Sequence, residues 1–369
     1  MKKHWIVTKE PLVGSSTSNI IRLLFENKFR VHPKYFLRLH FALFMSIFFM
    51  PFRMIERIFF YRKIKKTKIA EDPIFIIGLW RSGSTYLNSL LAKNRNYGYP
   101  HFADTFFTTR FSLAFPKLAD KMVDRFLPET RPFDNVKISS EKPAEMEHSL
   151  ISYYSCSFTD GMIFPRNFWK YANYATLDVP QRKRRKWLKW YLFNIKKITY
   201  KEKGKKLILK NPSNTGRIRT LLELFPNAKF IHIHRNPYYT YASSINLHTK
   251  AREVFSLQKW DEKEMKDSIL KLYQNIYEQY SKDISLIPKE NFINISYEEF
   301  LKNPISTIEK IHRKLDLIGF KEYKEAFQEY IQEQEDYKPN IHQITDEIVK
   351  VVDANYDYAF ELFGYDKEK

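Results

Sequence analysis

The stretch "FIIGLWRSGSTYLNSLL", residues 75–91, decides the fold of this chain. It opens with a short apolar run that ends at a glycine, and it closes with Leu87, Leu90 and Leu91 at helical spacing. A continuous apolar run of this length is typical of a strand that is buried on both faces of a parallel sheet. The stretch therefore predicts a strand, a loop and a helix, in that order.

The loop between this strand and this helix has the form of a phosphate-binding loop without its lysine. Gly78 and Gly83 have the separation found in G-x-x-x-x-G-K-S/T, and Thr85 fills the last place, but Ser84 occupies the lysine position. Backbone N–H groups at the start of the helix, together with the helix dipole, predict an anion site. Neighbouring side chains add hydrogen-bond donors to that site: Arg81, Ser82, Ser84 and Thr85.

The same order of strand, loop and helix recurs along the chain. Strands are predicted at 207–209, 230–234 and 292–295, and each is followed by a turn and a helical pattern. After the second of these strands, Asn236 and Pro237 predict a helix start, because Asn is a favoured cap and Pro a favoured first residue. Strands that alternate with helices predict an α/β fold with a doubly wound parallel sheet flanked by helices.

The turn after residues 230–234 disfavours metal-assisted triphosphate chemistry. Enzymes of that kind hold Mg²⁺ with an aspartate that follows a strand. Here the predicted strand ends with His234 and Arg235, and no carboxylate follows directly. An arginine at the carboxyl edge of an open sheet favours an anion as the ligand, so we expect no metal here.

Two segments together resemble the sulfotransferase family: "RSGSTYL" (81–87) and "HRNPYYTYASS" (234–244). The first is similar to the family's loop for the 5′-phosphosulfate of 3′-phosphoadenosine 5′-phosphosulfate (PAPS), and the second to its 3′-phosphate site. The arginine and serine of that second site are eight positions apart in the family, as are Arg235 and Ser243 here. The resemblance implies a P-loop-like fold and a metal-free sulfuryl transfer from PAPS to a hydroxyl or amine of an acceptor, such as a glycan or lipid.

The resemblance covers roughly residues 71–369, and the N-terminal region more loosely. Segments at 131–150, 207–218 and 295–304 are similar to bacterial sulfotransferases with a long basic N-terminal region, which are related to the tyrosyl-protein sulfotransferases. We therefore predict a helical region at 1–70 and a sulfotransferase domain at 71–369.

The resemblance also implies roles for single residues. Those expected to bind PAPS are Arg81, Ser82, Gly83, Ser84, Thr85, Tyr86, Arg235, Ser243, Tyr297 and Lys338. Lys210, which ends a predicted strand, resembles the lysine that contacts the sulfuryl oxygens, and Arg81 is expected to assist in catalysis. For the general base we rank Glu147 first and Glu145 second, because they lie in an acidic cluster that precedes an apolar helix; His101 and Asp104 follow.

Residues 19–65 predict helices of unusual apolar density. The uncharged run from Leu39 to Phe52 has 14 residues, whereas a membrane-spanning helix needs about 20. Pro51 is expected to kink or end the helix. Three interpretations stay open: a core helix, a partner-binding helix, or a helix in a membrane interface, where the basic residues at 62–68 would suit acidic head groups.

Composition narrows the partners and the compartment. The 369 residues carry a formal net charge of +20, which favours an anionic partner, but no nucleic-acid module is recognisable. The single cysteine, Cys156, cannot form an internal disulfide, and no secretory signal opens the chain. We expect a cytoplasmic protein, peripheral at the inner face of the membrane if its N-terminal region binds lipid. The alternatives are a nucleotide kinase and a non-catalytic basic membrane-peripheral protein; the oligomeric state stays open.

Overall fold

The chain forms two compact units. The computed structural model describes residues 11–106, 109–126, 130, 136–154, 157–334 and 343–367. The first unit comprises Met1–Ile69, Tyr99–Gly204 and His248–Met265, and the second comprises Ala70–Gly98, Lys205–Leu247 and Lys266–Lys369. One limit between the units falls beside the predicted boundary at residue 70, but both units contain parts of 71–369. The assignment of 1–70 and 71–369 as functional domains stays a prediction.

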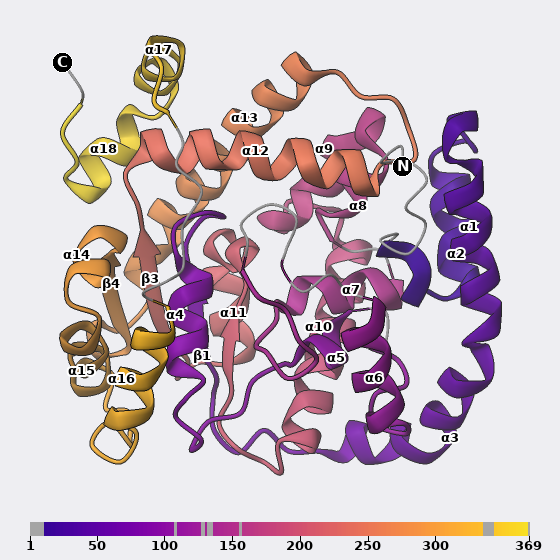
Figure 1. Ribbon diagram of the computed structural model, residues 1–369, viewed down its shortest axis with the longest axis horizontal. Coiled ribbons are helices and arrows are strands. Elements are labelled where there is room, and N and C mark those ends of the chain that lie inside the picture. Colours follow the sequence, from indigo (N-terminus) through magenta and orange to yellow (C-terminus); the bar gives the residue numbers. More distant parts are fainter. Residues whose placement is uncertain are drawn as a thin grey trace. The chain divides into compact units, whose positions relative to one another are not determined.

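The second unit is built on a parallel sheet of four strands in the order β2-β1-β3-β4. Its strands are β1 (Ile74–Ile77), β2 (Ile208–Lys210), β3 (Lys229–His234) and β4 (Phe292–Ser296). Figure 1 labels three of them, β1, β3 and β4. All four strands predicted from the sequence are present, which confirms the α/β fold. Because β2 and β3 pair with opposite sides of β1, the order of strands reverses there, and the loops after β1 and β3 leave the same edge side by side.

Helices bury both faces of this sheet. On one face, Ile76 packs in a cluster with Leu87 of α4 (Ser84–Leu91). On the other face, the ring of Phe75 lies 6.0 Å from that of Phe225, which follows α11 (Ile218–Leu224). Further along the unit come α14 (Tyr297–Lys302), α15 (Pro304–Lys314), α16 (Lys324–Glu333), α17 (Asp346–Asn355) and α18 (Asp357–Phe363). The continuous apolar run of β1 is thus explained by burial on two sides.

The first unit is helical. It contains α1 (Thr17–Glu26), α2 (Phe36–Phe48), α3 (Met50–Lys66), α5 (Phe102–Thr105), α6 (Pro116–Phe126), α7 (Met146–Tyr154), α8 (Asp160–Ile163), α9 (Phe168–Ala172) and α10 (Gln181–Lys201). Part of its core is a stack of Phe49 on Phe111, with ring centroids 5.0 Å apart. Two longer helices, α12 (Pro237–Phe255) and α13 (Glu262–Asp283), contribute residues to both units.

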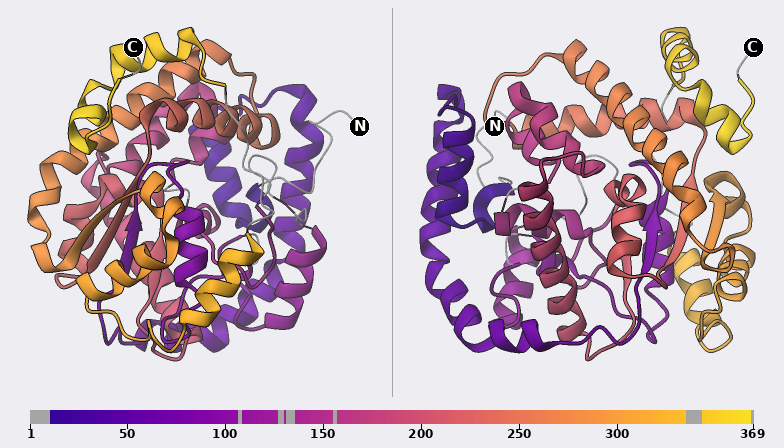
Figure 2. Two further views of the ribbon diagram at one scale, coloured as in Figure 1. Left: turned by 60° about the vertical axis from the view of Figure 1, so that its left-hand side comes forward. Right: turned by 180° about the vertical axis from the view of Figure 1, so that it is seen from behind.

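The predicted helical segment at 19–65 is present as α1, α2 and α3 (Figure 2). Pro51 lies in the first turn of α3, and α2 and α3 are bent by 42° at the break that precedes it, as expected for this residue. Within the described residues, no single helix is long and apolar enough to cross a membrane. The segments Pro33–Phe48 and Met50–Lys66 meet that criterion only as a bent pair.

A buried ion pair attaches α3 to α10. Lys197 Nζ lies 2.5 Å from Glu56 Oε1, and the two side chains are 1% and 6% exposed. Glu56 Oε2 also accepts a hydrogen bond of 2.8 Å from the backbone N–H of Leu113. Desolvation of both charges is costly, so either charge left alone would destabilise the unit strongly.

We expect Lys197→Met to lower the free energy of unfolding by about 3–5 kcal/mol, because it leaves the Glu56 carboxylate buried without its cation. Urea titration of the purified chain measures this. Arg185→Ala, at an exposed position of the same helix, should change stability by no more than about 0.5 kcal/mol. The double variant Glu56→Gln/Lys197→Met should recover much of the loss; equal losses in the single and double variants would contradict the account.

Candidate active site

The loop from Gly78 to Gly83 joins β1 to α4 and is shaped by its backbone. Gly78 has φ 139°, and a Cβ on this residue would meet Ile233 O at 2.1 Å, so a side chain is excluded. Its N–H donates to Thr215 Oγ1 over 2.8 Å. Gly83 has φ 89° and caps α4. The loop is therefore held by its neighbours in a shape that only glycine permits at both ends.

Arg81 is the strained residue of this loop. Its φ is 74°, a conformation that costs a non-glycine residue roughly 1–2 kcal/mol. Strain of this kind persists where the surrounding structure imposes it, and it is found most often at functional sites. Arg81 Nε donates a hydrogen bond of 2.8 Å to Ser243 Oγ on α12. The first predicted motif is therefore in direct contact with the second.

The second loop, from β3 to α12, brings Arg235 to the same place. Asn236 Oδ1 accepts from the backbone N–H of Tyr238 over 3.0 Å, as expected for a helix cap before Pro237. The Arg235 guanidinium carbon lies 4.7 Å from the ring centre of Tyr297, and Arg235 Nη1 lies 3.5 Å from Arg81 O. Burial lowers the pKa of Arg235, and an anion beside the guanidinium would offset that desolvation.

Tyr297 also explains why the loop needs glycine at residue 83. A Cβ there would meet Tyr297 Cδ2 at 2.2 Å. The tyrosine begins α14 directly after β4, so its ring joins the loop after β1 to the loop after β3. The structure thus brings Arg81, Gly83, Arg235, Ser243 and Tyr297 together at one edge of the sheet.

Among the residues that the structure describes, a buried hydroxyl in the first loop has no hydrogen-bond partner. Ser82 is 1% exposed, and its Oγ makes no hydrogen bond to any described residue. Ser84, the first residue of α4, is also buried, whereas Thr85 is half-buried. A buried hydroxyl without a partner is costly, and a phosphate or sulfate oxygen would satisfy it. This observation fits an anionic ligand in the loop.

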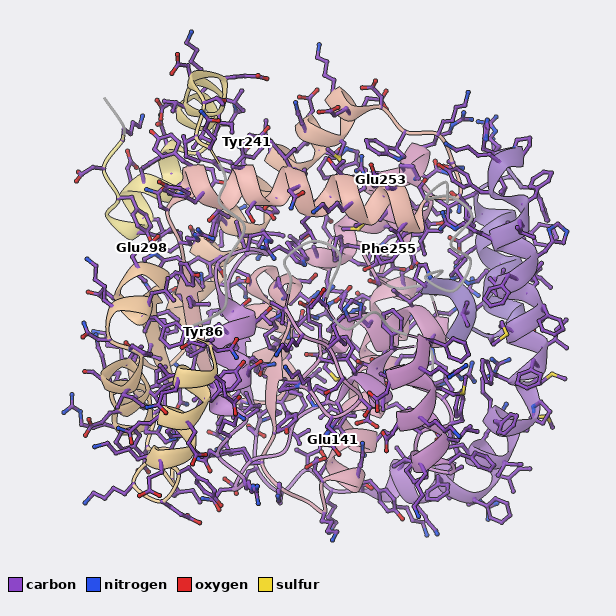
Figure 3. The ribbon with its side chains drawn as sticks, in the orientation of Figure 1. Tyr86, Glu141, Tyr241, Glu253, Phe255 and Glu298 are labelled. Atoms are coloured by element: carbon purple, nitrogen blue, oxygen red, sulfur yellow. The ribbon has the colours of Figure 1, made fainter. Side chains whose placement is uncertain are left out.

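Tyr86 has a packing role that the structure makes plain. Its ring lies 5.0 Å from that of Phe300 and 6.1 Å from that of Tyr330, and Figure 3 shows it on α4. Burial raises its pKa to about 12, so the phenol stays protonated at neutral pH. Packing accounts for Tyr86 as it stands, and its role toward PAPS stays a prediction.

Lys210 is the last residue of β2 and is 3% exposed. It lies in register with Ile76 of β1, two residues before Gly78. A buried lysine at the carboxyl edge of a parallel sheet lies on the side where ligands bind in open α/β folds. Lysines are seldom buried unless a partner or ligand stabilises their charge, which favours a function over a solvated surface position.

The general-base candidates belong to the first unit, whereas the two loops belong to the second. Glu147, in the first turn of α7, is buried, and Glu145 just before that helix is half-buried. His101 and Asp104 instead form a reciprocal cap of α5. Each also has an ion-pair partner: His101 Nε2 lies 3.3 Å from Glu202, and Asp104 Oδ2 lies 2.8 Å from Lys201. These contacts give both a structural role.

Lys338 lies outside the described residues. Among the residues that are described, no group of three or more His, Cys, Asp or Glu side chains is placed to hold a metal ion.

His234, which ends β3, has its pKa lowered to about 4 by burial, so it is neutral at pH 7. Its Nδ1 lies 2.9 Å from Tyr365 Oη.

Sequence reasoning missed Glu298. Its Oε1 accepts from the backbone N–H of Asn236 over 3.1 Å, and its Oε2 accepts from the Tyr365 hydroxyl over 2.7 Å. Figure 3 shows Glu298 at the start of α14. Because the tyrosine hydrogen is used on Glu298, His234 donates to the tyrosine oxygen. This chain of bonds holds the loop of Arg235 in place. Two signals pointed to Glu298: an acidic residue in the first turn of a predicted helix, and its place in the segment 295–304 that resembles the family.

Comparison with known proteins agrees with this geometry. The model of the sulfotransferase family matches residues 73–322. The omega-hydroxy-beta-dihydromenaquinone-9 sulfotransferase Stf3 of Mycobacterium tuberculosis is 31% identical, and the match covers 99% of this chain and 94% of that protein. The protein of the same name from Mycobacterium bovis matches equally well.

Two solved structures share the fold. Sulfotransferase STF9 from Mycobacterium avium has a TM-score of 0.65 at 16% identity, covering 86% of this chain and 83% of that one. Sulfotransferase STF1 from Mycobacterium tuberculosis has a TM-score of 0.58 at 16% identity, covering 85% and 86%. The resemblance inferred from the two motifs is confirmed: the chain belongs to the sulfotransferase family, and it is a sulfotransferase.

Proposed function

We propose that this enzyme transfers a sulfuryl group from PAPS to a hydroxyl group of a membrane lipid. The observation that carries the donor assignment is the 2.8 Å hydrogen bond from Arg81 to Ser243. It joins the loop after β1 to α12, the helix that follows the loop after β3, at the reversal point of the sheet. Each of the two loops leads into a helix and supplies an arginine. Such a pair of sites suits a nucleotide with phosphate at two positions.

The first loop holds the 5′-phosphosulfate in this proposal. The backbone N–H groups at the start of α4 and the hydroxyls of Ser82, Ser84 and Thr85 donate to its oxygens, and the Arg81 guanidinium balances its charge. The partnerless Ser82 Oγ supports this role, since it needs an acceptor. Gly78 and Gly83 keep the loop in this shape, because a side chain on either would clash with Ile233 O or with the Tyr297 ring.

The second loop holds the 3′-phosphate. The Arg235 guanidinium, whose pKa is lowered by burial, offers several N–H donors to the phosphate. Ser243 adds a hydroxyl from the first turns of α12. Tyr297 lies against both Arg235 and Gly83 and is available to flank the adenosine. Glu298 does not touch the ligand in this scheme; it positions the loop through Asn236.

The transfer breaks the bond between sulfur and the phosphate oxygen and forms a bond between sulfur and the acceptor oxygen. The acceptor proton passes to a carboxylate, Glu147 or Glu145, and the products are adenosine 3′,5′-bisphosphate and a sulfate ester. During the transfer, negative charge moves toward the leaving phosphate, and Lys210 stabilises the charge on the sulfuryl oxygens. These residues act by positioning and by electrostatic stabilisation.

A lipid acceptor is supported by the relatives. The curated proteins at 31% identity are named for a sulfotransferase of omega-hydroxy-beta-dihydromenaquinone-9, which is a hydroxylated lipid. The match extends over 99% of the chain, so it includes the helices before β1 as well as the sheet. We therefore favour a lipid hydroxyl over a glycan or an amine.

The donor assignment is tested by calorimetric titration. We expect adenosine 3′,5′-bisphosphate to bind the wild-type chain at least tenfold more tightly than ATP with Mg²⁺. Arg235→Ala should weaken bisphosphate binding about 10–100-fold, the cost of one charge-assisted contact. Arg313→Ala, at an exposed position of α15, should leave the affinity unchanged. Unaltered binding in Arg235→Ala would contradict the 3′-phosphate site, and tighter binding of ATP with Mg²⁺ would restore the kinase alternative.

For Lys210→Ala we expect kcat to fall about 10²–10³-fold while the KM for PAPS changes less than threefold. The reason is that the lysine stabilises charge that develops only during transfer. The measurement is the rate at which a radiolabelled sulfuryl group from PAPS enters hydroxylated lipids. A loss confined to KM would place Lys210 in ground-state binding instead.

The two carboxylates are separated by matched variants. If Glu147 is the base, Glu147→Gln should lower kcat by about 10²–10⁴-fold and abolish the acid limb of the pH–rate profile. Glu145→Gln should retain most of the activity and the wild-type profile. The reverse pattern would identify Glu145, and full activity in both variants would remove both from this role.

A further inference from the structure

The helices α1, α2 and α3 expose an exceptional amount of apolar surface. Of the nineteen exposed large apolar side chains in the described residues, thirteen lie between Ile21 and Phe59. We call them the α1–α3 apolar surface: Ile21, Phe25, Phe29, Phe36, Leu37, Phe44, Ile47, Phe48, Met50, Met54, Ile55, Ile58 and Phe59. So many exposed large apolar side chains on three consecutive helices are unusual for a soluble monomer unless they bind something.

The burial pattern of these helices is inverted relative to a water-facing helix. In α2, Phe44 is 63% exposed, whereas Arg38 is fully buried. In α3, Ile58 is 68% exposed, whereas Glu56 is 5% exposed. At these positions a helix that faced water would turn its charged side chains outward and its apolar ones inward. The exposed charges of α3 are all basic: Arg57 and, in its last turns, Arg62, Lys63, Lys65 and Lys66. The outward face is therefore matched to an apolar environment.

Specific bonds fix this orientation. Arg38 Nη1 donates to Ser256 O over 3.1 Å, and Arg53 Nη1 donates to Ser15 O over 3.3 Å. Glu56 pairs with Lys197 in the interior. Rotation of α2 or α3 to bury its phenylalanines would break these bonds and leave their buried partners without a hydrogen bond or a counter-charge. The exposure of the α1–α3 apolar surface is therefore fixed by the hydrogen bonds and the ion pair that hold α2 and α3 in this orientation.

The charged residues around this surface indicate what it binds. Residues 11–68 contain twelve Lys and Arg but only two acidic residues, Glu26 and Glu56. Both glutamates have ion-pair partners, Glu26 with Arg22 and Glu56 with Lys197. The exposed basic residues of this segment are Lys28, Arg30, Lys34, Arg57, Arg62, Lys63, Lys65, Lys66 and Lys68. An apolar surface with exposed cations and no exposed anion complements acidic phospholipids.

We propose that the α1–α3 apolar surface docks the enzyme on an anionic lipid bilayer, with the helices in the interface. Phe and Ile side chains enter the boundary between head groups and acyl chains, and the lysines contact the phosphates. A spanning arrangement would require the bent α2–α3 pair to carry Arg53, Glu56 and Arg57 into the hydrocarbon. The inference rests on this surface alone and holds whatever the sulfuryl donor and acceptor are.

Sedimentation of the purified chain with vesicles tests the docking. We expect the protein to pellet with vesicles of phosphatidylcholine and phosphatidylglycerol, and only weakly with phosphatidylcholine alone. Combining Phe44→Ser, Ile58→Ser and Phe59→Ser should weaken binding at least tenfold. Combining Lys63→Gln, Lys65→Gln and Lys66→Gln should weaken it on the order of 100-fold, and high salt should release the wild-type protein.

Matched controls lie on the second unit. The apolar control combines Leu286→Ser, Leu301→Ser and Ile318→Ser, at positions 43%, 49% and 66% exposed. The charge control combines Lys310→Gln, Lys314→Gln and Lys321→Gln, all exposed. Both should bind vesicles as the wild type does, and all variants should keep the wild-type melting temperature. The proposal fails if the wild type stays in solution with acidic vesicles, or if it forms a dimer that the apolar variant splits without any vesicle binding.

Discussion

The contact between Arg81 and Ser243 is the interaction on which the active site depends. It exists because β1 and β3 are neighbours in a parallel sheet, so the loops that follow them leave one edge together. Arg81 makes this contact with a left-handed backbone, in a loop that has glycine at residues 78 and 83. This arrangement places two arginines, Arg81 and Arg235, beside two helix starts at one edge of the sheet.

Groups that never touch a ligand keep these loops in place. Thr215 holds the backbone of Gly78, while Glu298 holds that of Asn236 and is itself held by Tyr365 near the end of the chain. Tyr297 fills the space beside Gly83 and lies against Arg235. The two loops are therefore supported by residues that follow β2 and β4 and by a tyrosine near the end of the chain.

The helical unit follows a different physical rule. Its N-terminal helices bury charged side chains through specific bonds and expose aromatic rings. Such an arrangement is unfavourable in water and favourable at a lipid interface. The rest of the helical unit provides the two carboxylates considered as bases, Glu147 and Glu145.

The sequence alone determined the four strands, the two helix starts and the family, because these features are written in local patterns. An apolar run, a pair of glycines or an Asn-Pro cap has the same meaning wherever it occurs. Tertiary structure decided what depends on distant partners: Arg81 meets Ser243 from 162 positions away, and Glu298 reaches Asn236 across 62. It also decided which faces of α2 and α3 are buried, since the bonds that turn Arg38, Arg53 and Glu56 inward are made to residues far away in the sequence.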